Sequence, residues 1–166
     1  MLTQADLEAL LLDVEALDTG QLLKEGLRLY RELYLNKGHV GVHETHDGQP
    51  LLFYEEQFEH AFWSSSDRWS GPYLKVRVAK ERIARIRWIG HLLAGRVGRS
   101  CCLQGTGIGS PGRHENRLYV IPPRLYVVWL EPRAAGGWKF YSGYPATRER
   151  VNEYQKGRRL IARWDL

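Results

Sequence analysis

The hydrophobic residues of the first 37 positions recur at helical spacing. In the segment 3–17 they fall three or four positions apart, as on one face of a helix: Leu7, Leu10, Leu11, Val14 and Leu17. Thr3 and Asp6 form a variant of the capping box that begins such helices. A second series predicts a helix over residues 21–36. We expect the two helices to form a hairpin packed on the rest of the chain.

The period changes after residue 37. Alternation over residues 39–43, the Asp47-Gly48 turn signal and the apolar run 51–54 predict a β-hairpin. Further strands are predicted over residues 73–78, 117–121, 124–130, 138–144 and 160–164, further helices over 55–63, 81–94 and 152–156, and a Gly-rich loop over 95–115. Helices followed by antiparallel strands predict an α+β protein. We expect one domain over residues 1–166, with a helical N-terminal region over residues 1–37 and an α+β region over residues 38–166.

Composition narrows the class of protein. The two cysteines, Cys101 and Cys102, are adjacent and have no third cysteine to pair with, which favours a reducing, cytoplasmic compartment. The first residues are acidic rather than basic, and no apolar run approaches the length of a membrane span, so we expect no signal peptide and no membrane partner. The net charge of +5 favours an acidic partner, above all nucleic acid.

Arginines are the candidate phosphate-binding groups. Arg82 and Arg85 lie three positions apart in a predicted helix and would share one face. Arg87 and Arg117 are further candidates. Arg124 begins an apolar predicted strand, where a charged side chain is unexpected and therefore suggests a function. The alternative is that each arginine belongs to a solvated surface or, for Arg124, to the start of a strand.

Histidine is the candidate proton-transfer group. His60 follows a glutamate between aromatic residues, and an imidazole exchanges its proton near neutral pH. The alternative for His60 is a half-buried side chain on a helix face. His43 and His46 have a spacing that metal ligands use, but no further ligand completes the set, so we expect no metal. The Gly-rich run 105–109 lacks a nucleotide-binding context, and we expect no cofactor.

Hydroxyl groups end the last long predicted strand. Ser142 and Tyr144 could orient phosphate oxygens by hydrogen bonding, whereas Thr147 fits the N-cap of a helix better. Together with Phe53–Phe62 and residues 117–147, the run Ser142-Gly143-Tyr144-Pro145 resembles the phage-associated barnase–EndoU–colicin–RelE-like nucleases. That resemblance implies N-terminal helices before a twisted antiparallel sheet with one or two further helices. It also implies a metal-independent ribonuclease of the toxin or phage-accessory kind.

The resemblance implies a role for each candidate residue. His60 would be the general acid or base, with His43 as a second proton-transfer group. Arg82, Arg85 and Arg124 would bind the phosphate, and Ser142 and Tyr144 would position it. We expect these groups to converge in one cleft and the substrate to be RNA. The alternatives are a non-enzymatic nucleic-acid-binding or inhibitor protein of phage origin, and a toxin whose N-terminal helices bind an antitoxin, an immunity protein or a second copy.

Overall fold

The computed structural model describes residues 1–36, 38–64, 77–106 and 114–166, and the fold of these segments is α+β. Its helical segments are α1 (Gln4–Ala9), α2 (Thr19–Tyr30), the π-helix η1 (Arg31–Leu35), α3 (Gln57–Phe62), α4 (Lys80–Ala84), α5 (Ile86–Leu93), the 3-10 turn η2 (Pro122–Arg124) and α6 (Arg148–Gly157). Its strands are β1 (Val40–Glu44), β2 (Pro50–Tyr54), β3 (Trp63–Ser64), β4 (Arg77–Val78), β5 (Ser100–Gly105), β6 (Asn116–Ile121), β7 (Tyr126–Pro132), β8 (Trp138–Pro145) and β9 (Arg159–Trp164).

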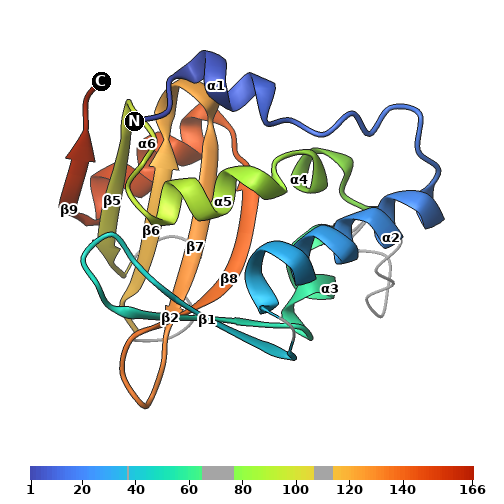
Figure 1. Cartoon of the computed structure of the whole chain (residues 1–166). Coiled ribbons are helices and arrows are strands. Elements are labelled where there is room, and N and C mark those ends of the chain that lie inside the picture. The colour runs from blue at the N-terminus through green and yellow to red at the C-terminus, as the bar shows by residue number, and fades with distance from the viewer. Residues whose placement is uncertain (37, 65–76, 107–113) are drawn as a thin grey trace, which may run out of the picture.

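Seven strands form one mixed sheet in the order β1-β2-β8-β7-β6-β5-β9 (Figure 1). The pairs β8–β7, β7–β6, β6–β5 and β5–β9 are antiparallel, as is the hairpin β1–β2. The expectation of a purely antiparallel sheet is wrong at one place, because β2 and β8 pair in parallel through Leu51↔Trp138 and Leu52↔Lys139. This short contact joins the early hairpin to the late strands.

Both faces of the sheet are covered. Helices α2 and α5 contribute to a large apolar core on one face, the first core, which includes Trp88 and Tyr119. Helix α6 closes a smaller core on the other face, the second core, with Val151 and Tyr154. β6 is buried along its whole length, since alternate residues enter the two cores.

The predicted loop over residues 95–115 is wrong for its first half. Residues 100–105 form β5, which lies between β6 and β9. Cys102 enters the first core and Cys101 the second, so both thiols are buried. A strand that is buried on both faces shows no apolar–polar alternation, and the flanking glycines and serine concealed it. The remaining loop prediction falls partly on residues 107–113, outside the described residues.

The N-terminal helical hairpin is not confirmed. Helix α1 ends at Ala9, and Figure 1 shows it across one end of the sheet, away from α2. Thr3 caps α1 and Asp18 caps α2, each with a complete capping box. Between them the chain is not helical, and the amide of Leu12 donates to the carbonyl of Ala84. The apolar residues of this segment are therefore buried by tertiary contacts rather than by a continuous helix.

Two other predicted elements differ at their ends. The helix over residues 81–94 is interrupted at Arg85, whose backbone leaves the helical region, so it forms α4 and α5. The strand predicted from residue 124 begins at Tyr126, because Pro122 and Pro123 start the turn η2. The prediction of a strand over residues 73–78 falls mostly outside the described residues.

The predicted hairpin of β1 and β2 is confirmed, with Gly41 opposite Phe53. Gly41 lies directly against the π-helix η1: a Cβ atom there would be 1.5 Å from the carbonyl oxygen of Tyr34. The same carbonyl accepts a hydrogen bond from His43 Nε2 at 2.9 Å. The backbone of β1 therefore rests on the backbone of η1, and only glycine permits this approach.

Replacing Gly41 with alanine should destabilise the protein by about 3 kcal/mol, because the obstructing atom belongs to the backbone and cannot rotate away. Chemical denaturation of the variant measures this loss. Gly48→Ala is the matched control for a glycine of the same hairpin, although its positive φ of 76° adds a smaller strain of its own. Equal stability of Gly41→Ala and the wild type would contradict the packing of β1 on η1.

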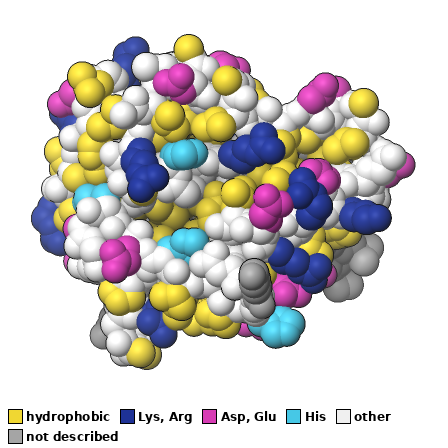
Figure 2. All heavy atoms as spheres, viewed as in Figure 1, with side chains coloured by type: hydrophobic (Ala, Val, Ile, Leu, Met, Phe, Trp, Pro, Cys, Tyr) yellow, Lys and Arg dark blue, Asp and Glu magenta, His cyan; other side chains and the backbone are white. Residues whose placement is uncertain are grey.

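The surface in Figure 2 mixes basic, acidic and hydrophobic side chains around a central hollow. Among the described residues, no helix is long and apolar enough to cross a membrane.

Candidate functional site

Helix α3 packs on β8 and carries His60 to that strand. Gln57 Nε2 donates to the carbonyl of Tyr141 at 2.7 Å, which fixes the helix against the strand. The His60 ring lies against the Tyr141 ring with 4.5 Å between their centroids. His60 is exposed and Tyr141 is half-buried, so this pair borders solvent.

A pocket of about 520 Å³ lies beside Tyr141 and is lined by side chains of β7, β8, the turn between them and the residues that precede β6. We call its charged, imidazole and phenol side chains together with His60 the β8 cluster: His60, His114, Glu131, Arg133, Lys139 and Tyr141. Alternation along β8 explains this placement. Trp138 and Phe140 enter the first core, while Tyr141 packs at the edge of the second core. Lys139 and Tyr141 line the pocket together with His114 and Arg133, and His60 adjoins it through the Tyr141 ring.

In the β8 cluster a hydrogen bond fixes the position of Glu131, and Tyr141 keeps its proton. Glu131 Oε1 accepts a hydrogen bond from Trp129 Nε1 at 2.6 Å, which anchors the carboxylate. Burial, and secondarily the charge of Glu131, raises the pKa of the Tyr141 hydroxyl. Tyr141 therefore keeps its proton at neutral pH and can donate a hydrogen bond.

Arg82 contacts α3, and Tyr144 contacts Arg82. Arg82 Nη1 donates to the Ala61 carbonyl at 3.0 Å, and its guanidinium lies 5.3 Å from the centre of the Tyr144 ring. The Tyr144 hydroxyl is hydrogen-bonded to the Tyr154 hydroxyl at 2.8 Å. Burial and this bond raise the pKa of Tyr144, so it stays protonated. The structure thus brings both predicted residues to the helix of His60, where their contacts hold the helix in place.

Two other predicted residues of this region, Ser142 and Arg85, make contacts within the fold and do not line the pocket. Ser142 is only 4% exposed and pairs with Trp129 in the sheet, so its hydroxyl does not border the β8 cluster pocket. Arg85 Nη1 donates to the Glu81 carbonyl, and its guanidinium stacks on Trp88. Arg85 thus stabilises the break between α4 and α5. The sequence pattern predicts one continuous helix over residues 81–94, so it gave no sign of this role.

The expectation that Arg124 joins the site is wrong. Its guanidinium donates to the side chain of Gln4 at 2.9 Å and to the carbonyl of Gln4 at 2.8 Å. It also forms an ion pair with Glu8. Arg124 therefore attaches α1 to the end of the sheet. Arg82 bonds to the Ala61 carbonyl next to His60, and Tyr144 contacts Arg82, whereas Arg124 lies with α1, so the phosphate would need other cations.

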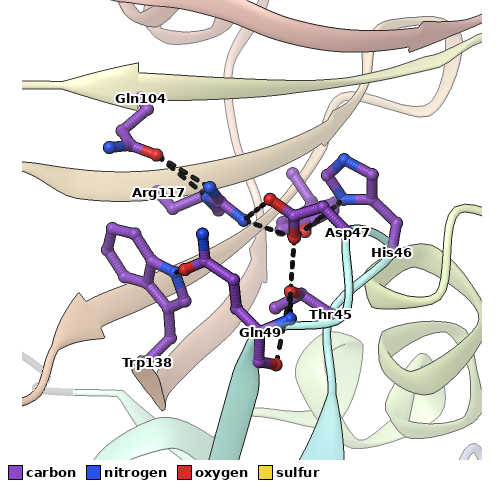
Figure 3. A network of polar contacts seen from close by, with 8 residues as sticks. Thr45, His46, Asp47, Gln49, Gln104, Arg117 and Trp138 are labelled. Carbon is purple, nitrogen blue, oxygen red and sulfur yellow. Dashed lines mark hydrogen bonds and ion pairs between the residues drawn. The ribbon is translucent and has the colours of Figure 1, made fainter. Parts of the chain in front are cut away.

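Arg117 is buried rather than free to meet nucleic acid. Its side chain is only 4% exposed and forms an ion pair with Asp47, from the turn between β1 and β2, at 2.9 Å (Figure 3). It also donates to Gln104 at 2.9 Å and stacks on Trp138 at 4.8 Å. Its position on β6, between two covered faces, explains the burial. The guanidinium fastens the turn of the β1–β2 hairpin to β5, β6 and β8.

The surrounding groups complete this buried network. Thr45 Oγ1 donates to Asp47 at 2.5 Å (Figure 3). His46 Nδ1 is hydrogen-bonded to the Tyr119 hydroxyl at 2.7 Å. Burial acts to raise the pKa of Asp47, but the hydrogen bonds from Thr45 and Arg117 and the charge of Arg117 outweigh it, so the pKa lies below its ordinary value. Burial lowers the pKa of His46.

The lowered pKa of Asp47 predicts a loss of stability in acid. A carboxyl whose pKa is lower in the folded state stabilises the protein above its unfolded value of about 3.8, and this contribution disappears as the pH falls through the folded pKa. We expect the difference in unfolding free energy between wild type and Asp47→Asn to shrink as the pH falls below about 4. Urea titrations at a series of pH values measure it. A difference that stays constant down to about pH 2 would contradict the ion pair.

His43 and Arg87 lie in a different place from His60. Both line a pocket on the face covered by α5. His43 points to Tyr34 and His46 to Tyr119, so the two do not share a ligand position. Within the described residues no group of three His, Cys, Asp or Glu side chains is placed to hold a metal ion.

Sequence reasoning missed His114, Lys139 and Tyr141. The alternation Trp138–Lys139–Phe140–Tyr141 carried a usable signal, because it places the second and fourth residues on one face. His114 carried none, since it directly follows the Gly-rich run. Comparison of the chain with protein-family models, with curated proteins and with solved structures gave no match.

Proposed function

We propose that the protein is a metal-independent endoribonuclease that cleaves RNA at the β8 cluster. The observation that carries the proposal is the place of Tyr141, whose ring contacts His60 and which lines one pocket together with His114, Lys139 and Arg133. This set contains two proton-transfer groups, cations and a hydrogen-bond donor. Those are the groups that attack by the RNA 2′-hydroxyl requires.

The reaction follows from the roles of these groups. One imidazole accepts the proton of the 2′-hydroxyl, whose oxygen attacks the adjacent phosphorus, and the bond from phosphorus to the 5′-oxygen breaks. The other imidazole gives a proton to the departing 5′-oxygen. Lys139 and Arg133 offset the added negative charge of the phosphorane, and the Tyr141 hydroxyl donates to a phosphoryl oxygen. The products are a 2′,3′-cyclic phosphate and a 5′-hydroxyl.

The β8 cluster also suits the binding of a single strand. Tyr141 is half-buried and offers a ring at the surface, and aromatic rings stack on bases of any sequence. The overall charge of +5 favours the approach of RNA. Binding by an antitoxin or a second copy at the N-terminal helices stays a prediction.

The experiment is incubation of labelled RNA and DNA of the same sequences with the protein in EDTA. We expect cleavage of RNA and none of DNA, because DNA lacks the 2′-hydroxyl. A pool of randomised RNA removes dependence on a sequence preference. Binding of RNA without any cleavage would favour the non-enzymatic alternative, and cleavage of both polymers would contradict the proposed chemistry.

A further inference from the structure

A second pocket lies on the face of the sheet opposite the β8 cluster. It is a hollow of about 350 Å³ between α5 and β1, and we call it the α5–β1 pocket. Its apolar floor includes Leu51 and Phe53, which belong to the first core. Figure 2 shows histidine and basic side chains around a hollow on the face where these elements lie. The proposed RNA chemistry does not use this pocket.

Charged and titratable groups surround the α5–β1 pocket from both sides. Helix α5 and the turn after it supply Arg87, His91 and Arg96, and β1 supplies His43 and Glu44. Two arginines against one glutamate give a net charge of +1 with both histidines neutral, and +3 with both protonated. Among the described residues, neither arginine takes part in an ion pair within 4.0 Å. Glu25 on α2 is a further acid near Arg87: its pKa is lowered by its hydrogen bond to Arg28 and, to a smaller extent, by the charge of Arg87.

The orientation of His43 is fixed. Its Nε2 faces the Tyr34 carbonyl at 2.9 Å, and since a carbonyl only accepts, Nε2 carries the proton. The edge-on contact with Phe53 at 5.2 Å holds the ring. The other nitrogen, Nδ1, then carries no proton and can accept a hydrogen bond.

His91 is in a state that a bound anion would change. Burial, and then the positive charge of Arg96, lowers its pKa. An anion between His91 and Arg96 would compensate both causes. Gly90 lets α5 pack closely on the Tyr34 ring beside the pocket, because a Cβ there would lie 3.2 Å from that ring.

We propose that the α5–β1 pocket binds the phosphate group of a small phosphomonoester. Arg87 and Arg96 would bind the phosphate oxygens by charge-assisted hydrogen bonds, and His91 would add a donor where the bound anion favours its protonation. The volume exceeds that of a phosphate ion alone, and the apolar floor suits the organic portion of a small molecule. Glu44 at the rim disfavours ligands with several negative charges.

Isothermal titration calorimetry with inorganic phosphate, adenosine 5′-monophosphate and adenosine tests the proposal. We expect the first two to bind at about pH 6 and adenosine not to bind. Tighter binding of the nucleotide than of phosphate identifies an organic monoester as the ligand, and equal binding identifies free phosphate. Sulfate keeps its two charges over this range, so its affinity should fall about tenfold from about pH 6 to about pH 8 as His91 loses its proton. No binding of phosphate or nucleotide at about 10 mM would overturn the proposal.

Variants of Arg87 and Arg96 test whether the phosphate binds in the α5–β1 pocket. Arg87→Gln and Arg96→Gln should each weaken phosphate binding about tenfold or more. Arg159→Gln, an exposed position on β9, removes the same charge and should bind as the wild type does. The double variant His60→Ala, Lys139→Ala should also bind phosphate as the wild type does, because both residues lie outside the α5–β1 pocket. The phosphate proposal can therefore fail or hold independently of the ribonuclease proposal. Equal weakening by Arg159→Gln, or loss of binding in the double variant with normal binding by Arg87→Gln and Arg96→Gln, would overturn the assignment.

Discussion

Replacing His60 with alanine should lower the rate of RNA cleavage by on the order of 10²-fold or more, the usual weight of one acid–base group. The His60 side chain is exposed on α3, so its loss removes a proton-transfer group without opening the core. The rate constant should fall while the affinity for RNA stays nearly unchanged, since Lys139, Arg133 and Tyr141 remain. Single-turnover cleavage and filter binding measure the two effects separately.

His39→Ala is the matched control, because the His39 side chain is 91% exposed and lies outside the β8 cluster. This variant should cleave RNA as the wild type does. His114→Ala should resemble His60→Ala if the two imidazoles act as acid and base. Equal cleavage by wild type and His60→Ala would exclude His60 from the reaction. His43, on the face of the sheet that α5 covers, would then be the next candidate for the proton-transfer group.

Asp47→Asn should destabilise the fold by about 3–5 kcal/mol, because it leaves the buried charge of Arg117 without its counterion. Arg117→Met should cost less, about 2 kcal/mol, since Asp47 is 32% exposed and water can solvate it. The double variant Asp47→Asn, Arg117→Met contains no buried charge at this pair. It should therefore be more stable than Asp47→Asn alone.

Urea unfolding of these three variants and the wild type forms a double-mutant cycle. Glu25→Gln is the control for an exposed ion pair: its partner Arg28 is 54% exposed, and the change should cost no more than about 0.5 kcal/mol. If the double variant loses the sum of the two single losses, the buried pair does not fasten the hairpin in the way described. RNA binding by folded Arg117→Met should be unchanged, because Arg117 is not at the surface.

Local patterns were sufficient to predict many elements. Alternation and the Asp47-Gly48 turn predicted the hairpin of β1 and β2, and Thr3 marked the start of α1. These signals act within a few residues, so the sequence displays them directly. The strand β5 and the end of α1 depend on contacts with distant segments. Neither the burial of β5 on both faces of the sheet nor the bond of Leu12 to Ala84 has a local pattern.

The candidate site was predictable to a similar extent. His60 stands out because a histidine between aromatic residues on a short helix suits proton transfer. The sequence could not distinguish an arginine at the surface from one with a buried partner. Arg117 meets Asp47 and Arg124 meets Glu8 only after the chain has folded, since 70 and 116 residues separate the two pairs. A count of basic residues therefore overstates the cations that are available to RNA.

The central claim is that RNA supplies its own 2′-hydroxyl at the β8 cluster, and the end groups of the products test it most directly. Mass spectrometry of an RNA pool digested in EDTA should show fragments that end in a 2′,3′-cyclic phosphate and begin with a 5′-hydroxyl. These fragments should be reduced on the order of 10²-fold with His60→Ala. Fragments that end in a 3′-hydroxyl and begin with a 5′-phosphate, or cyclic phosphates that form equally with His60→Ala, would contradict the claim.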